Sequence, residues 1–193
     1  MKERPIIFTG ESVRAILDGR KTQTRRLCAK AIDHGVPALS VHHDGAGTGW
    51  IAWWGKFAVD AENTKRLYPG SDGFTCPHGA VGDRLWVRET FNADWCDHVI
   101  FKADGGSAIE EGWSKEPRWK SPFFLKRKDS RIDLEITDVR VQRLTYATEK
   151  DARAEGFCSL DAMAVAWNAI NGKRATWSSS PWVWALTFRR VKP

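Results

Sequence analysis

The sequence predicts an α+β fold, a small mixed β-barrel with packed helices and long loop insertions. Three observations support this. The chain has 193 residues, enough for one domain with a substantial core. Its strand-like and helix-like segments do not alternate regularly, which argues against a doubly wound α/β sheet. Two stretches, at about 31–82 and 104–130, have the irregular composition of insertions. We therefore expect a single domain over residues 1–193.

The chain opens with a short apolar strand at 5–9 and a helix at 11–18 that Gly19 ends. The next seven residues, 20–26, contain four cations and two hydroxyls and no apolar periodicity. This segment is expected to be a loop or the lip of a strand. It is the densest polar cluster of the sequence.

The middle of the chain is harder to assign. A strand or hairpin is expected at 50–54, inside the first insertion. Residues 83–90 alternate imperfectly between apolar and polar, and 98–103 is expected to be the partner strand. The second insertion, 104–130, has the composition of a surface loop and holds a basic run at 126–128.

A long half-exposed strand is predicted from residue 132 to 141. Its apolar positions change parity near Thr137 and Asp138, as a β-bulge there would require. Residues 148–151 resemble a capping box that opens a short helix ending at Gly156.

The last two elements are a helix at 159–171, stopped by Gly172, and a closing strand at 182–189. One face of the helix is expected to carry its large apolar residues, Leu160, Met163, Trp167 and Ile170. Trp182 and Trp184 of the closing strand are expected in the core.

The composition indicates which kinds of partner and which cellular location to expect. Thirty Lys and Arg against 24 Asp and Glu give a net charge of +6, which suits an anionic partner such as RNA, DNA or a nucleotide. Four well-separated cysteines without C-x-x-C spacing are typical of free thiols. There is no apolar run of transmembrane length and no secretory h-region, so we expect a cytoplasmic protein with no membrane partner.

The chemistry is predicted to centre on Lys21 and Thr24. A lysine and a hydroxyl three residues apart after a helix stop can face one pocket, where a lysine of lowered pKa can deprotonate the hydroxyl for attack on an acyl carbon. The alternative from the residues alone is a solvated basic turn, or one that only holds phosphate.

The segment from Gly19 to Arg26 resembles the signature loop of the ASCH family, whose domains have a PUA-like barrel and are associated with RNA. Gly19, Lys21, Thr24 and Arg26 match its pattern. The form with threonine at the fourth place is similar to the small bacterial N4-acetylcytidine amidohydrolases. The resemblance implies that Lys21, Thr24 and a glutamate after the long central strand form the catalytic set.

Alignment of the helix at 148–156 with that family puts Glu155 at the catalytic glutamate. The alternative is an exposed helical glutamate. The whole chain also resembles a longer ASCH-like group of phages and prophages. The matching segments are 4–6, 19–26, 82–89, 130–132 and 171–174. The two insertions make the chain almost twice as long as the compact amidohydrolases, and they could cover the pocket or change its substrate.

The function expected is therefore binding of a nucleoside or RNA in a basic cleft, with hydrolysis of the amide of N4-acetylcytidine or a related nucleoside. Lys21 would be the base toward Thr24, with Glu155 orienting Lys21 or relaying a proton; water attack with Glu155 as base is the alternative. The residues expected to bind substrate or nucleic acid are Arg20, Arg25, Arg26, Arg88 and Glu89.

Two other function classes stay open. One is a non-catalytic RNA-binding module that holds phosphates with Arg25, Arg26 and the run 126–128, and the other is an RNA-cleaving enzyme.

No cofactor or metal is expected, although two Cys-x-His pairs, 76–78 and 96–98, offer four zinc-type ligands at cramped spacing. Trp50, Trp53 and Trp54 can stack a base, but core packing is the commoner role of such residues.

Overall fold

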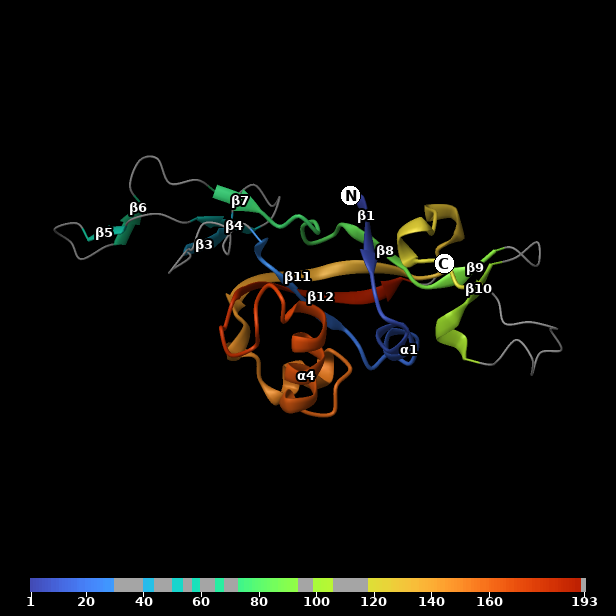
Figure 1. Ribbon diagram of the computed structural model, residues 1–193. Coiled ribbons are helices and arrows are strands. Elements are labelled where there is room, and N and C mark those ends of the chain that lie inside the picture. The colour runs from blue at the N-terminus through green and yellow to red at the C-terminus, as the bar shows by residue number, and fades with distance from the viewer. Residues whose placement is uncertain are drawn as a thin grey trace.

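The computed structural model describes residues 1–29, 40–43, 50–53, 57–59, 65–67, 73–93, 99–105 and 118–191. Its centre is a five-stranded mixed sheet (Figure 1). In spatial order the strands are β1 (Glu3–Ile7), β8 (Arg84–Arg88), β11 (Asp133–Arg143), β12 (Trp182–Val191) and β2 (Gln23–Leu27). With helices packed against the sheet, the α+β class predicted from the sequence is confirmed.

The sheet joins one parallel pair, β1 with β8, to a set of antiparallel pairs. The longest ladder, β11 with β12, changes register between Ile136 and Asp138. This is the predicted bulge, and it lets β11 bury apolar side chains on both sides of the irregularity. β2 begins at Gln23, so the polar segment after Gly19 is a loop only as far as Thr22.

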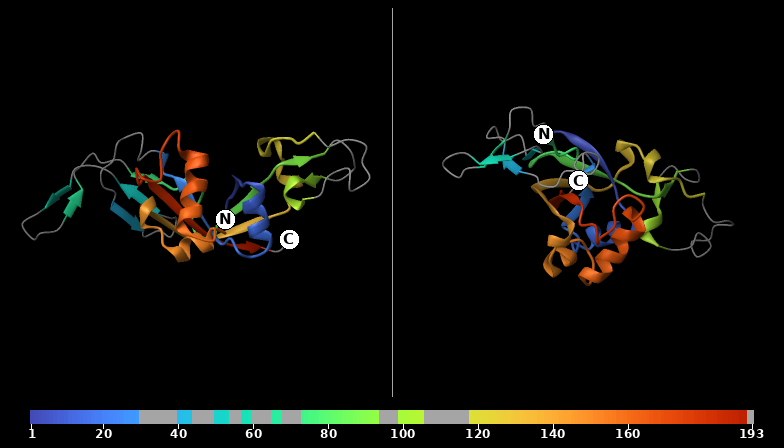
Figure 2. Two further views of the ribbon diagram at one scale, coloured as in Figure 1. Left: turned by 60° about the horizontal axis from the view of Figure 1, so that its bottom comes forward. Right: turned by 60° about the vertical axis from the view of Figure 1, so that its left-hand side comes forward.

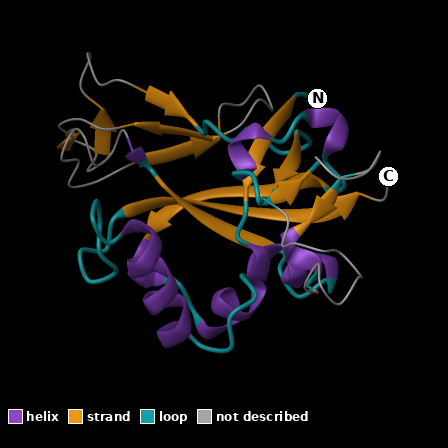
Figure 3. Ribbon diagram, turned by 45° about the vertical axis from the view of Figure 1, so that its right-hand side comes forward, coloured by secondary structure: helices purple, strands orange, loops and turns teal. Residues whose placement is uncertain are grey.

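Three α-helices have the caps that their sequences encode. The helices are α1 (Gly10–Leu17), α3 (Glu149–Ala154) and α4 (Leu160–Asn171). Thr148 and Asp151 form the predicted capping box of α3, and the Ser159 side chain accepts from the first turn of α4. Figure 3 shows the helices grouped against the long strands.

Short elements complete the described chain (Figure 2). β9 (Phe91–Asn92) pairs with β10 (Ile100–Phe101), β3 (Ser40–His43) and β7 (Gly73–Thr75) flank β4 (Trp50–Trp53), and β5 (Phe57–Val59) pairs with β6 (Lys65–Leu67). The 3₁₀ turns are η1 (Lys102–Asp104), η2 (Pro122–Phe124), η3 (Arg127–Asp129) and η4 (Leu144–Tyr146).

Two expectations for the middle of the chain change. The strand expected at 98–103 is only two residues long, and it pairs with β9 rather than with the strand at 83–90. That position is not available because β8 already has β1 on one side and β11 on the other. The segment 104–130 is not simply a loop, since it contains η2 and η3 and buries Leu125.

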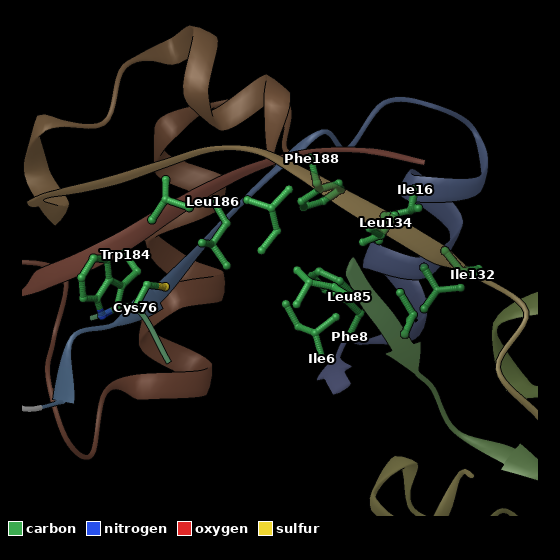
Figure 4. Packing of buried hydrophobic residues seen from close by; sticks show 14 of the residues in the cluster. Ile6, Phe8, Ile16, Cys76, Leu85, Ile132, Leu134, Trp184, Leu186 and Phe188 are labelled. Carbon is green, nitrogen blue, oxygen red and sulfur yellow. The ribbon is translucent and has the colours of Figure 1, made fainter. Parts of the chain in front are cut away.

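The core lies along one face of the sheet, and the part of it around Leu134 and Ile132 packs against α1, whereas the part with Trp184 and Cys76 lies away from that helix (Figure 4). Ile6, Leu85, Leu134 and Leu186 are fully or nearly fully buried. Strand β12 is covered on both faces. Trp184 belongs to this core, whereas Val183 packs with Leu144 and Trp167 on the other side. Trp184 is therefore core as predicted, and Trp182 is partly buried at its edge.

The closure of the sheet into a barrel is not confirmed. In the described chain, β1 and β2 are its two edges. They approach each other through a side chain, because Nη2 of Arg26 donates to the carbonyl oxygen of Ile7 at 2.6 Å. Separately, none of the helices in the described ranges is long and apolar enough to cross a bilayer.

Candidate functional site

A pocket of about 420 Å³ opens between the two edge strands and helix α4. That volume is within the range of small-molecule sites. Most of its polar lining comes from β2, the loop before it, the end of α3 and the turn after β7, and most of its apolar lining from β1 and α4. The lining side chains with polar groups include Lys21, Thr24, Arg25, Arg26, His78 and Glu155.

Lys21 is placed in the pocket by the turn that ends α1. Gly19 adopts a positive φ of 74°, and the backbone N–H groups of Arg20 and Lys21 both donate to the carbonyl oxygen of Ala15 at 2.9 Å. The next residue, Thr22, donates its N–H to Ala154 at the end of α3. The lysine is thus fixed against α3, and it is only 4% exposed.

The Lys21 ammonium faces Glu155. Nζ donates to the carbonyl oxygen of Glu155 at 2.9 Å and lies 3.7 Å from Oε2 of its carboxylate. Burial lowers the pKa of Lys21 to about 8, although the Glu155 charge acts in the opposite direction and Arg26 adds to the lowering. Near neutral pH a usable fraction of this amine is therefore uncharged.

Glu155 is the C-cap residue of α3 and is 7% exposed. Its burial excludes the alternative of an exposed helical glutamate. The following residue, Gly156, has a φ of 88° and turns the chain so closely toward α1 that a Cβ there would lie 3.0 Å from that of Ala15. This close approach brings the end of α3 beside Lys21.

Arg25 holds the carboxylate of Glu155. Its Nη1 donates to Oε1 of Glu155 at 2.6 Å and to the Gln23 side chain at 2.8 Å, while Nη2 lies 3.2 Å from Oδ1 of Asp151. The Arg25 guanidinium therefore lies between the carboxylates of Glu155 and Asp151. The Arg25 guanidinium is buried and paired with carboxylates in this structure, and its expected role in holding phosphate stays a prediction.

Thr24 lies on β2 opposite Leu186 of β12, is 3% exposed and lines the same pocket as Lys21. Between the described residues, no hydrogen bond joins its hydroxyl to the Lys21 amine. Catalytic contacts often shorten only when substrate is bound. The structure therefore brings Lys21, Thr24 and Glu155 to one pocket.

His78 is a pocket residue that the sequence suggested only as a metal ligand. Burial lowers its pKa to about 4, and the nearby charges of Arg26 and Arg4 act in the same direction. The imidazole is therefore neutral at pH 7 and can both donate and accept a hydrogen bond.

Only one of the two Cys-x-His pairs considered as zinc ligands, Cys76 with His78, lies within the described residues. Cys76 is buried in the core, where burial raises the pKa of its thiol to about 12, whereas His78 faces the pocket. The second pair, at 96–98, lies outside the described residues, as do the side chains of Trp50, Trp53 and Trp54. No cluster of three metal-type ligands occurs within the described part of the chain, and its three cysteines are not disulfide-bonded.

Aromatic and apolar groups form the other walls. The Phe8 ring lies 5.6 Å from Nζ of Lys21 and 5.1 Å from the guanidinium carbon of Arg26. Phe157 and Trp167 line the pocket from the helical side. Ile170, expected with the buried face of α4, is 66% exposed because that part of the helix faces the open pocket. These walls suit a planar ring.

Three residues expected to bind substrate lie elsewhere. Arg20 is exposed and pairs with Asp18 at 2.8 Å. Glu89 is 1% exposed and accepts from the Arg131 guanidinium through both carboxylate oxygens at 2.9 Å. Arg88 projects from the outer face of β8, between the rings of Trp86 and Phe123. None of the three lines the pocket, because each side chain is directed to partners outside it.

Comparison with known proteins gives one structural match. The chain is similar to the crystal structure of an ASCH domain from Lactobacillus crispatus JV V101. The TM-score is 0.47 at 14% sequence identity, over 98% of this chain and 79% of the other. No protein-family model matches the chain, and no curated protein sequence matches it.

Proposed function

We propose that the pocket binds a nucleoside, free or within RNA, and hydrolyses an amide on its base, with N4-acetylcytidine as the representative substrate. The observation that carries this proposal is the placement of Lys21. Its buried amine, with a pKa of about 8, faces a pocket that also contains a hydroxyl and is walled by aromatic rings.

The residues suit nucleophilic acyl transfer. The neutral amine of Lys21 takes the proton of Thr24 Oγ1 as that oxygen attacks the acetyl carbon. The carbon–nitrogen bond then breaks, and the Lys21 ammonium returns the proton to the departing amino group of the base. Water releases acetate from the resulting Thr24 ester by the reverse sequence.

Lys21 is a better general base here than Glu155. The Glu155 carboxylate already has a cation at each oxygen, because Arg25 Nη1 lies 2.6 Å from Oε1 and Lys21 Nζ lies 3.7 Å from Oε2. A general base works best when its pKa lies near the working pH, as that of Lys21 does. Glu155 is assigned the role of orienting the amine through its carbonyl oxygen and supporting the ammonium form.

The test is release of cytidine from N4-acetylcytidine, followed by chromatography with the no-enzyme rate subtracted. Lys21→Ala should abolish turnover. Lys150→Ala is the matched control, since it removes an exposed lysine that does not line the pocket, and it should retain full activity. Absence of turnover by the folded wild-type protein would overturn the hydrolase proposal.

A second candidate, RNA binding without catalysis, is favoured by one observation. Arg26 lines the pocket beside Phe8, where a cation and an aromatic ring can contact a phosphate and a base. It predicts nucleoside or RNA binding that survives in Lys21→Ala without any product. The RNA-cleaving alternative predicts shortened strands, which gel analysis of the same reactions would reveal.

A further inference from the structure

A second surface lies on the outer face of the sheet, around the segment 118–131. Six of its 14 residues are lysine or arginine and one, Asp129, is acidic. It also contains the most exposed phenylalanines of the described chain, Phe123 at 69% and Phe124 at 72%. Figures 1 and 2 show this yellow segment beside β9 and β10.

The segment is firmly anchored. Leu125, directly after the two phenylalanines, is 1% exposed and packs with Phe91 and Phe101. Arg127 donates to Glu3 of β1 and to Asp133 of β11, each at 2.9 Å. The exposed rings are therefore held out by a fixed backbone.

Phe123 is the outer member of a stack. The guanidinium carbon of Arg88 lies 4.5 Å from the ring centroid of Trp86, which is buried, and 5.9 Å from that of Phe123. Nε of Arg88 is buried and finds no hydrogen-bond acceptor among the described residues. The guanidinium is therefore held by its contacts with the two rings. The solvent-exposed face of the Phe123 ring can stack on one further planar group, such as a base.

The charges around the stack favour an anionic partner. Lys126 and Lys128 are exposed, and neither forms an ion pair with a carboxylate in the described ranges. Aromatic rings beside lysines are the elements of single-strand binding surfaces, where bases stack and phosphates meet cations. A duplex would not fit, because its bases are already stacked on each other.

The surface also adjoins the pocket. Arg88 lies opposite Ile7 in the parallel register of β1 and β8, and Ile7 is a pocket-lining residue on the edge strand. The backbone of Arg88 is therefore one strand spacing from a residue of the pocket rim. This adjacency is the reason to expect that a nucleic acid chain with one base in the pocket extends toward Phe123.

We propose that Phe123 and Phe124, with Lys126 and Lys128, bind single-stranded nucleic acid by base stacking and phosphate contact. The surface thereby selects a base carried in a strand over a free nucleoside. Only this last step rests on the proposed function of the pocket. The binding itself is independent of catalysis.

The test is fluorescence anisotropy with fluorescein-labelled ten-nucleotide oligo(A), as RNA and as DNA. Replacing both phenylalanines, Phe123→Ala with Phe124→Ala, should weaken binding about tenfold or more. Tyr146→Ala is the matched control, because Tyr146 is an equally exposed aromatic residue, at 71%, near the opposite end of β11. It should leave the affinity unchanged.

Salt titration separates stacking from phosphate binding. In the double variant Lys126→Ala with Lys128→Ala, the slope of log K against log salt concentration should become shallower by about 0.7 for each phosphate that is no longer neutralised. The phenylalanine variant should keep the wild-type slope. Unchanged binding by the folded phenylalanine variant, equal binding of the matching duplex, or no binding of either oligonucleotide by the wild type would overturn the proposal. Lys21→Ala should bind oligo(A) normally, so a failed hydrolase proposal is distinguishable.

Discussion

Nζ of Lys21 donates a hydrogen bond to the carbonyl oxygen of Glu155 at 2.9 Å, while the carboxylate of the same residue lies 3.7 Å away. One residue thus contacts the lysine through both its backbone and its side chain. The carbonyl contact fixes the position of the amine, and the carboxylate charge raises its pKa against the larger effect of burial. Substitution of Lys21 or Glu155 should therefore change the pH dependence of the reaction rate in the pocket.

Deacetylation should rise with pH, with a midpoint near 8, because only the uncharged amine of Lys21 accepts the Thr24 proton. Glu155→Gln removes the charge that stabilises the ammonium and should move the midpoint to lower pH. Initial rates from pH 6 to 10 measure both. A midpoint that moves upward in Glu155→Gln would contradict this electrostatic assignment.

The role of Thr24 is tested by two replacements of similar size. Thr24→Ser keeps a hydroxyl and should retain part of the activity, whereas Thr24→Val keeps the β-branched shape and should lose at least a hundredfold. Cytidine release at saturating substrate gives the comparison, with thermal melting as a check of folding. An active valine variant would leave water as the nucleophile.

Arg25→Met should destabilise the protein by about 3 kcal/mol or more, because it leaves the buried carboxylate of Glu155 without its closest cation. Arg189→Met breaks a pair with Glu135 whose arginine is largely exposed, and it should cost less than about 1 kcal/mol. Urea unfolding of both variants provides the measurement. Equal losses would show that the Arg25 network adds no more than a surface pair.

Two glycines with positive φ allow strain and crowding to be separated. Gly156→Ala brings a Cβ to 3.0 Å from Ala15 and 3.5 Å from Cβ of Lys21, whereas Gly19→Ala meets nothing within 4 Å. Both should lose about 1 kcal/mol from backbone strain, and Gly156→Ala should lose more and also lower turnover by displacing Lys21. Similar stability and activity in the two variants would contradict this.

His78 should make the protein less stable in acid. Its pKa is lowered from 6.5 to about 4 on folding, so between these values the unfolded chain binds more protons and stability falls as pH falls. His78→Gln removes this group, so its free energy of unfolding should fall less than that of the wild type between pH 7 and pH 4. The carboxylates titrate in both proteins, and their effect cancels when the two curves are compared. Parallel stability curves for the two proteins would indicate an ordinary histidine pKa.

Local signals in the sequence located much of the fold. The capping box at Thr148, the bulge near Asp138 and the helix stop at Gly19 were all predicted because each depends on residues within a few positions of one another. The partner of the strand at 100–101 was not, since strand pairing depends on which edges are already occupied.

The sequence by itself determined the α+β class, most element positions and the proximity of Lys21 to Thr24. Only the tertiary structure decided which charged side chains are paired with other residues of the protein and which can contact a ligand. Arg25 and Arg26 are neighbours in β2, yet Arg25 is buried against Glu155, 130 residues away, while Arg26 reaches across to β1. Burial and ion pairing depend on distant residues that folding brings together, and these set the pKa of Lys21, the neutrality of His78 and the exposure of Phe123.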